Sequence, residues 1–381
     1  MTLIILNNME LPKMMNTVVL EKPYKLSFKK IPLWDLDIFP NADEMVLLKV
    51  GACGVCGSDY RYYRGENPWA QHTLGYHIDN KPNIVLGHEF AGTVVAVANK
   101  KNKNLLGKRV VAICSKVCGK CYLCKTNRPN LCPNTVHLGH GQGWGDMNYY
   151  PGAYAEYVPV WAAGCYEIPD NLTFEEAAMM DILAVCLHVY NQGSKFPELP
   201  VLIIGCGPAG NGIAQVARIN GANKIIIIEK SELAIEIAKK NKFEYIINSD
   251  KKSINEIKDK VMQITDNHGC ISVFDSVGTD FSFELGLSVL DKGGTLINMA
   301  VHDSDIKFNN MKISSERKIT TSSNFIIEDY EKALKWLIEG RFDVKPWITK
   351  TNLSKIPEIF ETIIRSDKKP YFKVVITDFK K

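Results

Sequence analysis

A glycine-rich turn between a buried strand and a helix constrains the possible folds of this chain most strongly. The apolar run at residues 201–204 leads directly into Gly-Cys-Gly-Pro-Ala-Gly, and a helix is expected to follow. In this context the first glycine permits the tight turn, the second lets a pyrophosphate approach the backbone, and the third lets helix and strand pack closely. The helix N-terminus presents its amides and dipole to the phosphates. The predicted cofactor-binding residues of this turn are Gly205, Gly207, Pro208, Ala209 and Gly210.

Strands and helices alternate regularly around this turn. The sequence predicts strands at residues 201–204, 224–228, 245–247, 271–275 and 295–298, and helices at 210–220, 233–241, 254–265 and 281–290. Such alternation builds a parallel, doubly wound α/β sheet. A helix is expected before it at 173–191, and a helix at 327–339 and a strand at 373–377 after it. From about residue 15 to 160, short apolar runs broken by Gly, Pro and Asn predict irregular β structure with long loops.

An acidic residue at the end of the second predicted strand indicates which dinucleotide binds. Glu229 follows Ile228 and lies 19 residues after Gly210. A carboxylate there accepts hydrogen bonds from the ribose hydroxyls and repels a 2′-phosphate, which favours NAD over NADP. The neighbouring Lys230 weakens this argument, so NADP stays as the alternative cofactor.

The composition is that of a globular protein and gives no sign of a nucleic-acid or membrane partner. Of the 381 residues 46% are hydrophobic and 23% charged, and the net charge of +4 is not gathered in a basic stripe. No run approaches the roughly 18 apolar residues that a membrane helix needs. The first residues lack the positively charged start of a signal peptide. We therefore expect a cytoplasmic protein that acts on a small molecule.

The cysteines cluster in a way that indicates metal binding. Seven of the eleven lie between Cys53 and Cys132. In a large chain that is expected to be intracellular, thiols stay reduced and clustered cysteines more often hold metal than form disulfides. A C-x2-C-x2-C-x7-C run can wrap one zinc ion tetrahedrally and leaves no open coordination position, so it would stabilise a loop. An iron–sulfur cluster is the alternative, although the ferredoxin run has its fourth cysteine after three residues. The four residues are Cys118, Cys121, Cys124 and Cys132.

A second group of residues has the chemistry of an open metal site. Cys56 and, 32 residues later, His88 could supply two ligands of a catalytic zinc from separate loops. Asp59 and Glu89 are well placed in the sequence to orient them. Asp181 lies in an otherwise apolar stretch, where it is either a helix-surface acid or a buried carboxylate that needs a cation.

These motifs together resemble the zinc-containing medium-chain dehydrogenase family, in its sorbitol and threonine dehydrogenase-like branch. The resemblance extends from about Asn16 to Val375. It rests on the sequences Gly-Val-Cys-Gly-Ser-Asp at 54–59, Gly-His-Glu at 87–89 and Gly-Ala-Tyr-Ala-Glu-Tyr at 152–157, and on the cysteine run and the glycine turn. It implies a GroES-like β-rich catalytic domain, residues 1–183 and 326–381, and a Rossmann NAD-binding domain, residues 184–325.

The resemblance also implies the metal ligands. Cys56 and His88 match the family's catalytic zinc ligands, and Asp181 matches the acidic third position. Glu89 matches a residue that either orients the site or exchanges as a ligand. With the four-cysteine zinc, two zinc ions per chain are expected.

Two further positions match residues that handle the substrate. Ser58 matches the hydroxyl that passes the substrate proton onward, and Tyr62 matches a tyrosine of the substrate pocket. Arg61 occupies the position where the family commonly has a histidine that ends the proton relay. Arginine cannot lose its proton at ordinary pH, so the relay must leave through water or another group. His72 and His77 are candidates for that group, and the segment 137–151, rich in Gly, His and aromatic residues, either lines the pocket or is a surface loop.

The expected activity is the oxidation of a secondary alcohol (a polyol, cyclitol or similar compound) to a ketone. Alternatives in the same family are dehydrogenases of aldehydes, amino alcohols or amino-cyclitols. A non-catalytic NAD-binding relative is a further alternative, but it should have lost the ligands of the open metal site, which this chain keeps. Members of the family are usually dimers or tetramers, so a homo-oligomer is expected.

Overall fold

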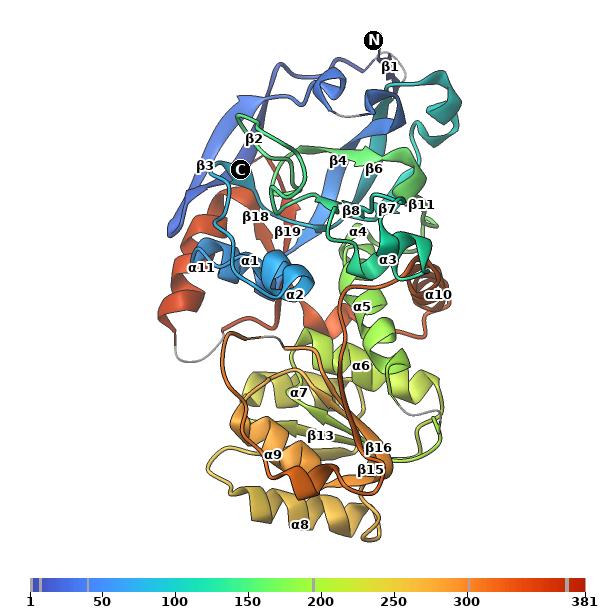
Figure 1. Cartoon of the computed structure of the whole chain (residues 1–381). Helices are drawn as coiled ribbons and strands as arrows, with labels where there is room; N and C mark the ends of the chain where they lie inside the picture. Colours follow the sequence, from blue (N-terminus) through green and yellow to red (C-terminus); the bar gives the residue numbers. More distant parts are fainter. Residues whose placement is uncertain are drawn as a thin grey trace. The chain divides into compact units, whose positions relative to one another are not determined.

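The chain folds into two compact units. The computed structural model describes residues 3–6, 9–39, 41–193, 196–300, 302–366 and 370–380. Unit 1 consists of Met1–Asp181 and Ile348–Lys381, and unit 2 of Ile182–Trp347 (Figure 1). No helix in the described ranges is long and apolar enough to cross a membrane.

Unit 2 is built on a parallel sheet of six strands. In sequence these are β12 (Val201–Ile204), β13 (Ile225–Glu229), β14 (Tyr245–Asn248), β15 (Cys270–Asp275), β16 (Leu290–Asn298) and β17 (Lys318–Thr321). They lie in the order β14-β13-β12-β15-β16-β17, and every neighbouring pair is parallel. This is the strand order of a dinucleotide-binding fold. The predicted doubly wound sheet is confirmed.

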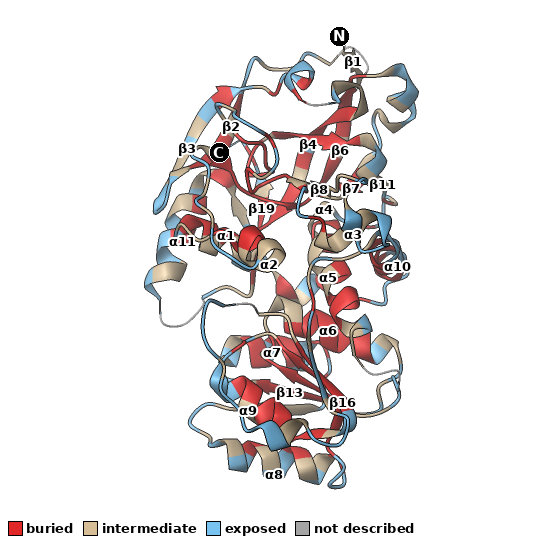
Figure 2. Ribbon diagram, in the orientation of Figure 1, coloured by how far each residue is buried: buried red, intermediate tan, exposed pale blue. Residues whose placement is uncertain are grey.

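Most helices of unit 2 bury one face, as their apolar periodicity requires, whereas α6 is buried all round over Gly210–Ala217. They are α6 (Pro208–Ile219), α7 (Glu232–Lys240), α8 (Ile254–Ile264), α9 (Asp280–Ser288) and α10 (Ile327–Ile338). In α8 the buried residues are Ile257 and Val261, one turn apart, whereas the opposite face is exposed (Figure 2). They join a core that includes Ile226, Val273 and Leu296 of the sheet.

Unit 1 contains an eight-stranded sheet that both ends of the chain help to form. Its central path is β11 (Cys165–Glu167), β7 (Arg109–Ala112), β6 (Glu89–Val97), β4 (Met45–Gly54), β19 (Lys373–Asp378) and β18 (Ile348–Asn352). In addition, β1 (Ile4–Ile5) pairs with β6 and β10 (Tyr157–Trp161) with β4. Two smaller sheets are formed by β3 (Lys25–Pro32), β2 (Met14–Lys22) and β5 (Ile84–Val85), and by β8 (Ser115–Lys116) and β9 (Val136–His137).

Short helices connect these strands. They are α1 (Gly57–Tyr63), α2 (Pro68–Leu74), α3 (Tyr122–Lys125), α4 (Phe174–Ala177), α5 (Met180–Asn191), which continues into unit 2, and α11 (Ile356–Arg365). Single 3-10 turns lie at 36–38, 42–44, 100–105, 129–131, 162–164, 310–313, 345–347 and 353–355.

Two differences from the sequence expectation concern the residues near the boundary between the units. The helix expected at 173–191 is two helices, because the capping box of Thr173 and Glu176 starts a single turn that ends before α5 begins. Residues 326–347, expected with the first domain, lie in unit 2. There Asp329 of α10 accepts hydrogen bonds from His188 at 2.5 Å and from Asn191 at 2.7 Å, which tie the helix to α5.

Candidate functional site

The four clustered cysteines converge on one point in unit 1. Their sulfur atoms lie 3.5 Å (Cys118 to Cys132), 3.5 Å (Cys121 to Cys124), 3.8 Å (Cys121 to Cys132) and 4.0 Å (Cys118 to Cys124) apart. A tetrahedral zinc with bonds of about 2.3 Å to sulfur requires sulfur–sulfur edges of about 3.8 Å. The donor set therefore fits one zinc ion.

Backbone N–H groups of this loop favour the thiolate of Cys118, whereas burial raises the pKa of Cys124 to about 12 and that of Cys132 above its usual value. The N–H groups of Lys120 and Cys121 lower the pKa of the Cys118 thiol to about 6. The Cys121 N–H lies 3.3 Å from the Cys118 sulfur, and the Cys124 N–H lies 3.5 Å from the Cys121 sulfur. All four are free cysteines rather than disulfides.

A second donor set forms where α1 and β6 begin. Cys56 is the N-cap residue of α1, and His88 directly precedes β6, whose first residue is Glu89. One ligand atom from each of these three residues lies within 4.8 Å of the others. Both side chains are buried, and among the described residues Oε1 of Glu89 has no hydrogen-bond partner. Oε2 of Glu89 faces only the ammonium group of Lys373, and Nδ1 of His88 lies 3.4 Å from Asp59. Buried polar atoms without partners are costly, so this donor set fits a cation.

Asp59 holds the two parts of this set together. It is completely buried, and its Oδ2 accepts hydrogen bonds from the Cys56 N–H and the Tyr154 hydroxyl, both at 2.8 Å. Its Oδ1 lies 3.4 Å from Nδ1 of His88. Burial opposes the charged carboxylate, but His88 and these two donors together lower the pKa of Asp59 below its usual value. The same carboxylate raises the pKa of His88 against the effect of burial.

Two residues expected to handle the substrate lie on α1. The hydroxyl of Ser58 is 3.5 Å from Nε2 of His88, on the side of the ring opposite Asp59. Tyr62 is fully buried, and its hydroxyl donates to Asn67 at 3.2 Å. The structure therefore brings Ser58 to the metal donors, whereas the Tyr62 hydroxyl is engaged elsewhere.

The residues considered for the end of the proton relay lie in and around α1 and α2. Nε of Arg61 donates to Glu66 at 2.7 Å, and the same guanidinium group also donates to Gln71. His72 lies in the last turn of α2. The side chain of His77 is 47% exposed and lies 3.6 Å from Asp79.

Asp181 lies in the first turn of α5, next to a cysteine that the sequence analysis did not single out. Its Oδ1 is 3.4 Å from the sulfur of Cys114, which in turn is 3.6 Å from Nε2 of His137. Burial raises the pKa of Asp181 to about 6. Within the described ranges, the donor set of Cys56, His88 and Glu89 does not include Asp181.

A buried lysine faces Glu89. Lys373 of β19 is 4% exposed, and its Nζ forms an ion pair with Oε2 of Glu89. Glu89 begins β6, and β6 and β19 lie on either side of β4. Gly54 of β4 stands between the two side chains, and a Cβ there would overlap Oε2 of Glu89. No sequence motif signals this pair, because its members lie far apart in the chain.

The segment 137–151 contributes two histidines to the same region. The rings of His137 and His140 stack with centroids 3.9 Å apart, and the His140 ring lies 4.7 Å from that of His88. The sequence analysis named this segment but not these side chains. Their spacing within a glycine-rich run is the only sequence signal that could have found them.

In unit 2 the glycine turn has the geometry of a phosphate cradle. Gly205 has a φ of +82°, which favours glycine. A Cβ on Gly210 would overlap the carbonyl oxygen of Gly205, so only glycine allows this approach of α6 to the turn. A Cβ on Gly207, the N-cap residue of α6, would meet nothing within 4 Å. The open space above Gly207 at the helix N-terminus, next to Pro208 and Ala209, fits a phosphate group.

Glu229 ends β13 beside this turn. Its Oε2 accepts the Cys206 N–H at 2.6 Å, and its Oε1 accepts the N–H groups of Lys230 and Ser231 at 2.7 and 2.8 Å. These backbone donors fix the carboxylate next to the glycine turn, which is the position for a partner of a ribose hydroxyl.

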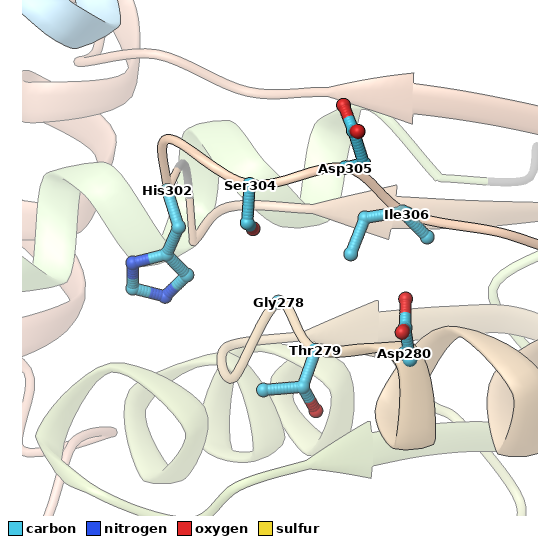
Figure 3. A pocket seen from close by; sticks show the side chains of 7 residues that line it. All are labelled: Gly278, Thr279, Asp280, His302, Ser304, Asp305 and Ile306. Atoms are coloured by element: carbon cyan, nitrogen blue, oxygen red, sulfur yellow. The ribbon is translucent and has the colours of Figure 1, made fainter.

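A pocket of about 430 Å³ lies at the same edge of the sheet. Figure 3 shows its lining, which comes from the turn after β15 and the segment after β16: Gly278, Thr279, Asp280, His302, Ser304, Asp305 and Ile306. Since β13, β12, β15 and β16 are neighbours and parallel, Glu229, the glycine turn and this pocket follow the carboxyl ends of adjacent strands. That edge is where open α/β sheets bind nucleotides.

Comparison with known families separates the chain into the same two parts. It matches the family model "Alcohol dehydrogenase GroES-like domain" over residues 42–170 and "Zinc-binding dehydrogenase" over residues 208–339.

Three named relatives cover most of the chain. A sorbitol dehydrogenase of Bacillus subtilis is 29% identical over 340 residues, 89% of this chain and 90% of the relative. A D-arabitol-phosphate dehydrogenase of Enterococcus avium is 30% identical over 344 residues, 87% and 90%. A probable D-xylulose reductase A of Aspergillus clavatus is 30% identical over 333 residues, 87% and 88%.

Solved structures share the fold. The alcohol dehydrogenase TADH from Thermus sp. ATN1 is similar with a TM-score of 0.80 and 25% identity, covering 96% of this chain and 100% of that one. A putative zinc-binding dehydrogenase from Sinorhizobium meliloti, bound to NADP, gives a TM-score of 0.83 at 23% identity. The match covers 96% of this chain and 100% of that one.

Proposed function

Since this chain belongs to the zinc-containing medium-chain dehydrogenase family, we propose that it oxidises a secondary alcohol of a polyol, cyclitol or similar compound to a ketone, with NAD as the hydride acceptor. The observation that carries this proposal is the donor set of Cys56, His88 and Glu89 next to the hydroxyl of Ser58. A closed site would stabilise a loop, whereas a site with three donors leaves a position for substrate.

Cys56 and His88 would hold the catalytic zinc, with Glu89 and Asp181 as candidates for the remaining ligand position. Glu89 is the stronger candidate in this arrangement, because its carboxylate belongs to the donor set and Asp181 instead contacts Cys114. When bound, zinc acts as a Lewis acid that lowers the pKa of the substrate hydroxyl. The four-cysteine loop would hold a second zinc ion that has no part in the reaction.

The side chains of unit 1 would orient the site and remove the proton. Ser58 takes the proton of the substrate hydroxyl and passes it on. Arg61 cannot continue this relay, and its bonds to Glu66 and Gln71 turn its guanidinium to those side chains, so the proton leaves through water. The carboxylate of Asp59 faces Nδ1 of His88 and would keep the ring in this orientation, which leaves Nε2 for the metal.

Unit 2 would bind the nicotinamide cofactor, which accepts the hydride from the carbinol carbon. The glycine turn would hold the pyrophosphate and Glu229 the ribose hydroxyls. The fixed carboxylate of Glu229 supports NAD over NADP, because it would repel a 2′-phosphate.

The substrate class is supported by the relatives. Those with about 30% identity include proteins named for sorbitol, D-xylulose and D-arabitol phosphate. All three compounds carry several neighbouring hydroxyl groups, and D-xylulose is the ketone form of such a compound. We also propose that the protein is cytoplasmic and that it forms a homodimer or homotetramer. Light scattering of the purified protein would test the oligomeric state.

A substrate panel tests the proposed function. Sorbitol, xylitol, D-arabitol, myo-inositol, 2,3-butanediol and threonine are each supplied with NAD⁺ or NADP⁺, and the formation of reduced nicotinamide is followed by its absorbance. Turnover of at least one polyol, faster with NAD⁺ than with NADP⁺, is expected. Activity with threonine or only in the direction of aldehyde reduction would contradict the substrate class, and faster reaction with NADP⁺ would contradict the role of Glu229.

A further inference from the structure

His140 lies in a position built by the segment 137–151. Its ring stacks on Tyr62, with centroids 4.5 Å apart and an angle of 27°, and on His137, 3.9 Å apart at 13°. Both faces of the imidazole are thus covered by other rings, and the ring plane is fixed. Only the edges of the ring, which carry the nitrogens, remain for polar interactions.

The backbone of this segment is anchored next to His88. Gly139 has a φ of +78°, and a Cβ there would lie 2.7 Å from the carbonyl oxygen of Gly87. The Ala153 N–H donates to that same carbonyl at 2.9 Å, and the Gly139 N–H donates to Pro151 at 2.7 Å. The two ends of the segment therefore close on the residue before His88, and they hold the next side chain, His140, against it.

Both nitrogens of His140 lack a hydrogen-bond partner within the described part of the chain, although the side chain is only 9% exposed. Two neighbouring atoms share this condition: Oδ1 of Asp59 and Nδ1 of His88. One ligand atom each of Asp59, His88 and His140 lies within 4.8 Å of the others. Oδ1 of Asp59 and Nδ1 of His88 at least face each other at 3.4 Å, whereas the His140 nitrogens face no partner among the described residues. His140 is therefore the buried group of this set that still needs a hydrogen bond.

We propose that His140, which makes no hydrogen bond among the described residues of this structure, is a positioning residue of the metal site: once zinc is bound, its ring N–H donates to Oδ1 of Asp59 and so fixes the carboxylate that orients His88. Oδ2 of Asp59 is already engaged by two donors, whereas Oδ1 faces only His88 at 3.4 Å. A neutral imidazole has one N–H, and a hydrogen bond from it to a buried carboxylate is charge-assisted and strong. This inference rests on the part of the proposed function that places a metal at His88.

The grouping of donor atoms favours this role over direct ligation. Cys56, His88 and Glu89 form one set, whereas His140 lies with Asp59 and His88 in the other. His140 therefore lies on the Asp59 side of the site. Groups that hold a metal-bound histidine through its second nitrogen typically change metal affinity about 10- to 100-fold when removed.

The test is zinc affinity, measured on the whole chain by competition with a chromophoric chelator. His140→Phe keeps a ring between Tyr62 and His137 but removes the N–H, and His140→Gln keeps a donor. His268→Phe, at an exposed position of unit 2, is the matched control. We expect His140→Phe to weaken zinc binding at the open site about 10- to 100-fold, His140→Gln to restore part of it, and the control to match the wild type. The four-cysteine zinc serves as the internal reference, whose affinity stays the same.

Two further results are required. In an Asp59→Asn background, which weakens the acceptor, His140→Phe should add little further loss. X-ray absorption at the open site of Cys118→Ser protein should show one imidazole ligand in both the presence and the absence of His140. Unchanged affinity in His140→Phe would overturn the proposal, and so would the loss of an imidazole ligand, since His140 would then bind the metal itself.

If His140→Phe does not fold, the zinc-bound wild type still decides the question. The ring N–H of His140 should give a hydrogen-bonded proton signal in nitrogen-15 NMR spectra, assigned with His140→Gln, and its absence would contradict the proposal. A wild-type protein that binds no zinc outside the four-cysteine loop would instead contradict the proposed function.

Discussion

The buried ion pair of Lys373 and Glu89 offers a quantitative test of the metal site. Lys373→Met keeps the volume of the side chain and removes its charge. Glu89 is fully buried and Lys373 4% exposed, so water cannot replace the lost ammonium group. Removing one partner of a buried ion pair typically costs about 3–5 kcal/mol, because the other charge is left uncompensated. We expect a loss of this size in the free energy of unfolding of the metal-free protein.

Zinc should reduce this loss. A cation held by Cys56, His88 and Glu89 supplies the positive charge that the variant lacks, so the destabilisation measured with saturating zinc should be smaller than that measured with a chelator. Replacing both partners, as in Glu89→Gln with Lys373→Met, should cost less than Lys373→Met alone, since no charge then stays unpaired.

The assay is urea unfolding followed by tryptophan fluorescence. Four of the six tryptophans, Trp34, Trp69, Trp144 and Trp161, lie in unit 1, so the signal reports mainly on the unit that contains the pair. Lys350, whose side chain is 64% exposed, pairs with Glu175 at the surface. Lys350→Met is therefore the matched control and should cost less than about 1 kcal/mol. A cost of that small size for Lys373→Met without metal, or equal costs with and without zinc, would refute the reasoning.

Three other predictions concern the cofactor turn, the cysteine loop and pH. Gly210→Ala should destabilise unit 2 by about 1–3 kcal/mol or more, because the new Cβ overlaps the Gly205 carbonyl oxygen. Gly207→Ala should leave thermal stability unchanged and weaken NAD binding, measured by calorimetry, because its Cβ enters open space. Equal losses of stability in the two variants would contradict this. Cys118→Ser should remove one zinc per chain, measured by mass spectrometry, and lower stability with an unaltered order of preferred substrates; unaltered zinc content would contradict it. Zinc affinity at the open site should fall as pH decreases, because protons compete with the metal for His88. Since the pKa of His88 is raised above its usual value of 6.5, the fall should already be seen above pH 6.5. A chelator titration that gives the same zinc affinity throughout that range would be contrary evidence.

The strands and helices of unit 2 could be predicted because each carries its own signal. The sequence places β12 at the residues that the structure gives it, and α7, α8 and α10 within one residue at each end. β17 was missed, since Lys-Ile-Thr-Thr is a short run at the edge of the sheet with no buried apolar stretch. α1 and α2 were missed because each has only seven residues, too few for a clear period, within a region of strands and loops.

The candidate site was predictable only where its residues carry a motif. Cys56, His88 and Glu89 were recognised from their local sequence, and the structure brings their donor atoms together. Lys373 and Cys114 act through contacts across the sheet and to α5, which sequence spacing does not reveal. The roles of His137 and His140 depend on positive-φ glycines that fold their segment back onto Gly87, and such tertiary closure has no local signature.

We propose that alcohol oxidation depends on the donor set of Cys56, His88 and Glu89. The most direct test compares Cys56→Ser with the wild type in zinc content and in alcohol-dependent reduction of NAD⁺. The wild type should hold two zinc ions per chain and reduce NAD⁺ with a polyol. Cys56→Ser should keep the zinc of the four-cysteine loop, lose the other, still bind NAD, and show no turnover. Full turnover in Cys56→Ser, with or without the second zinc, would contradict the proposed mechanism.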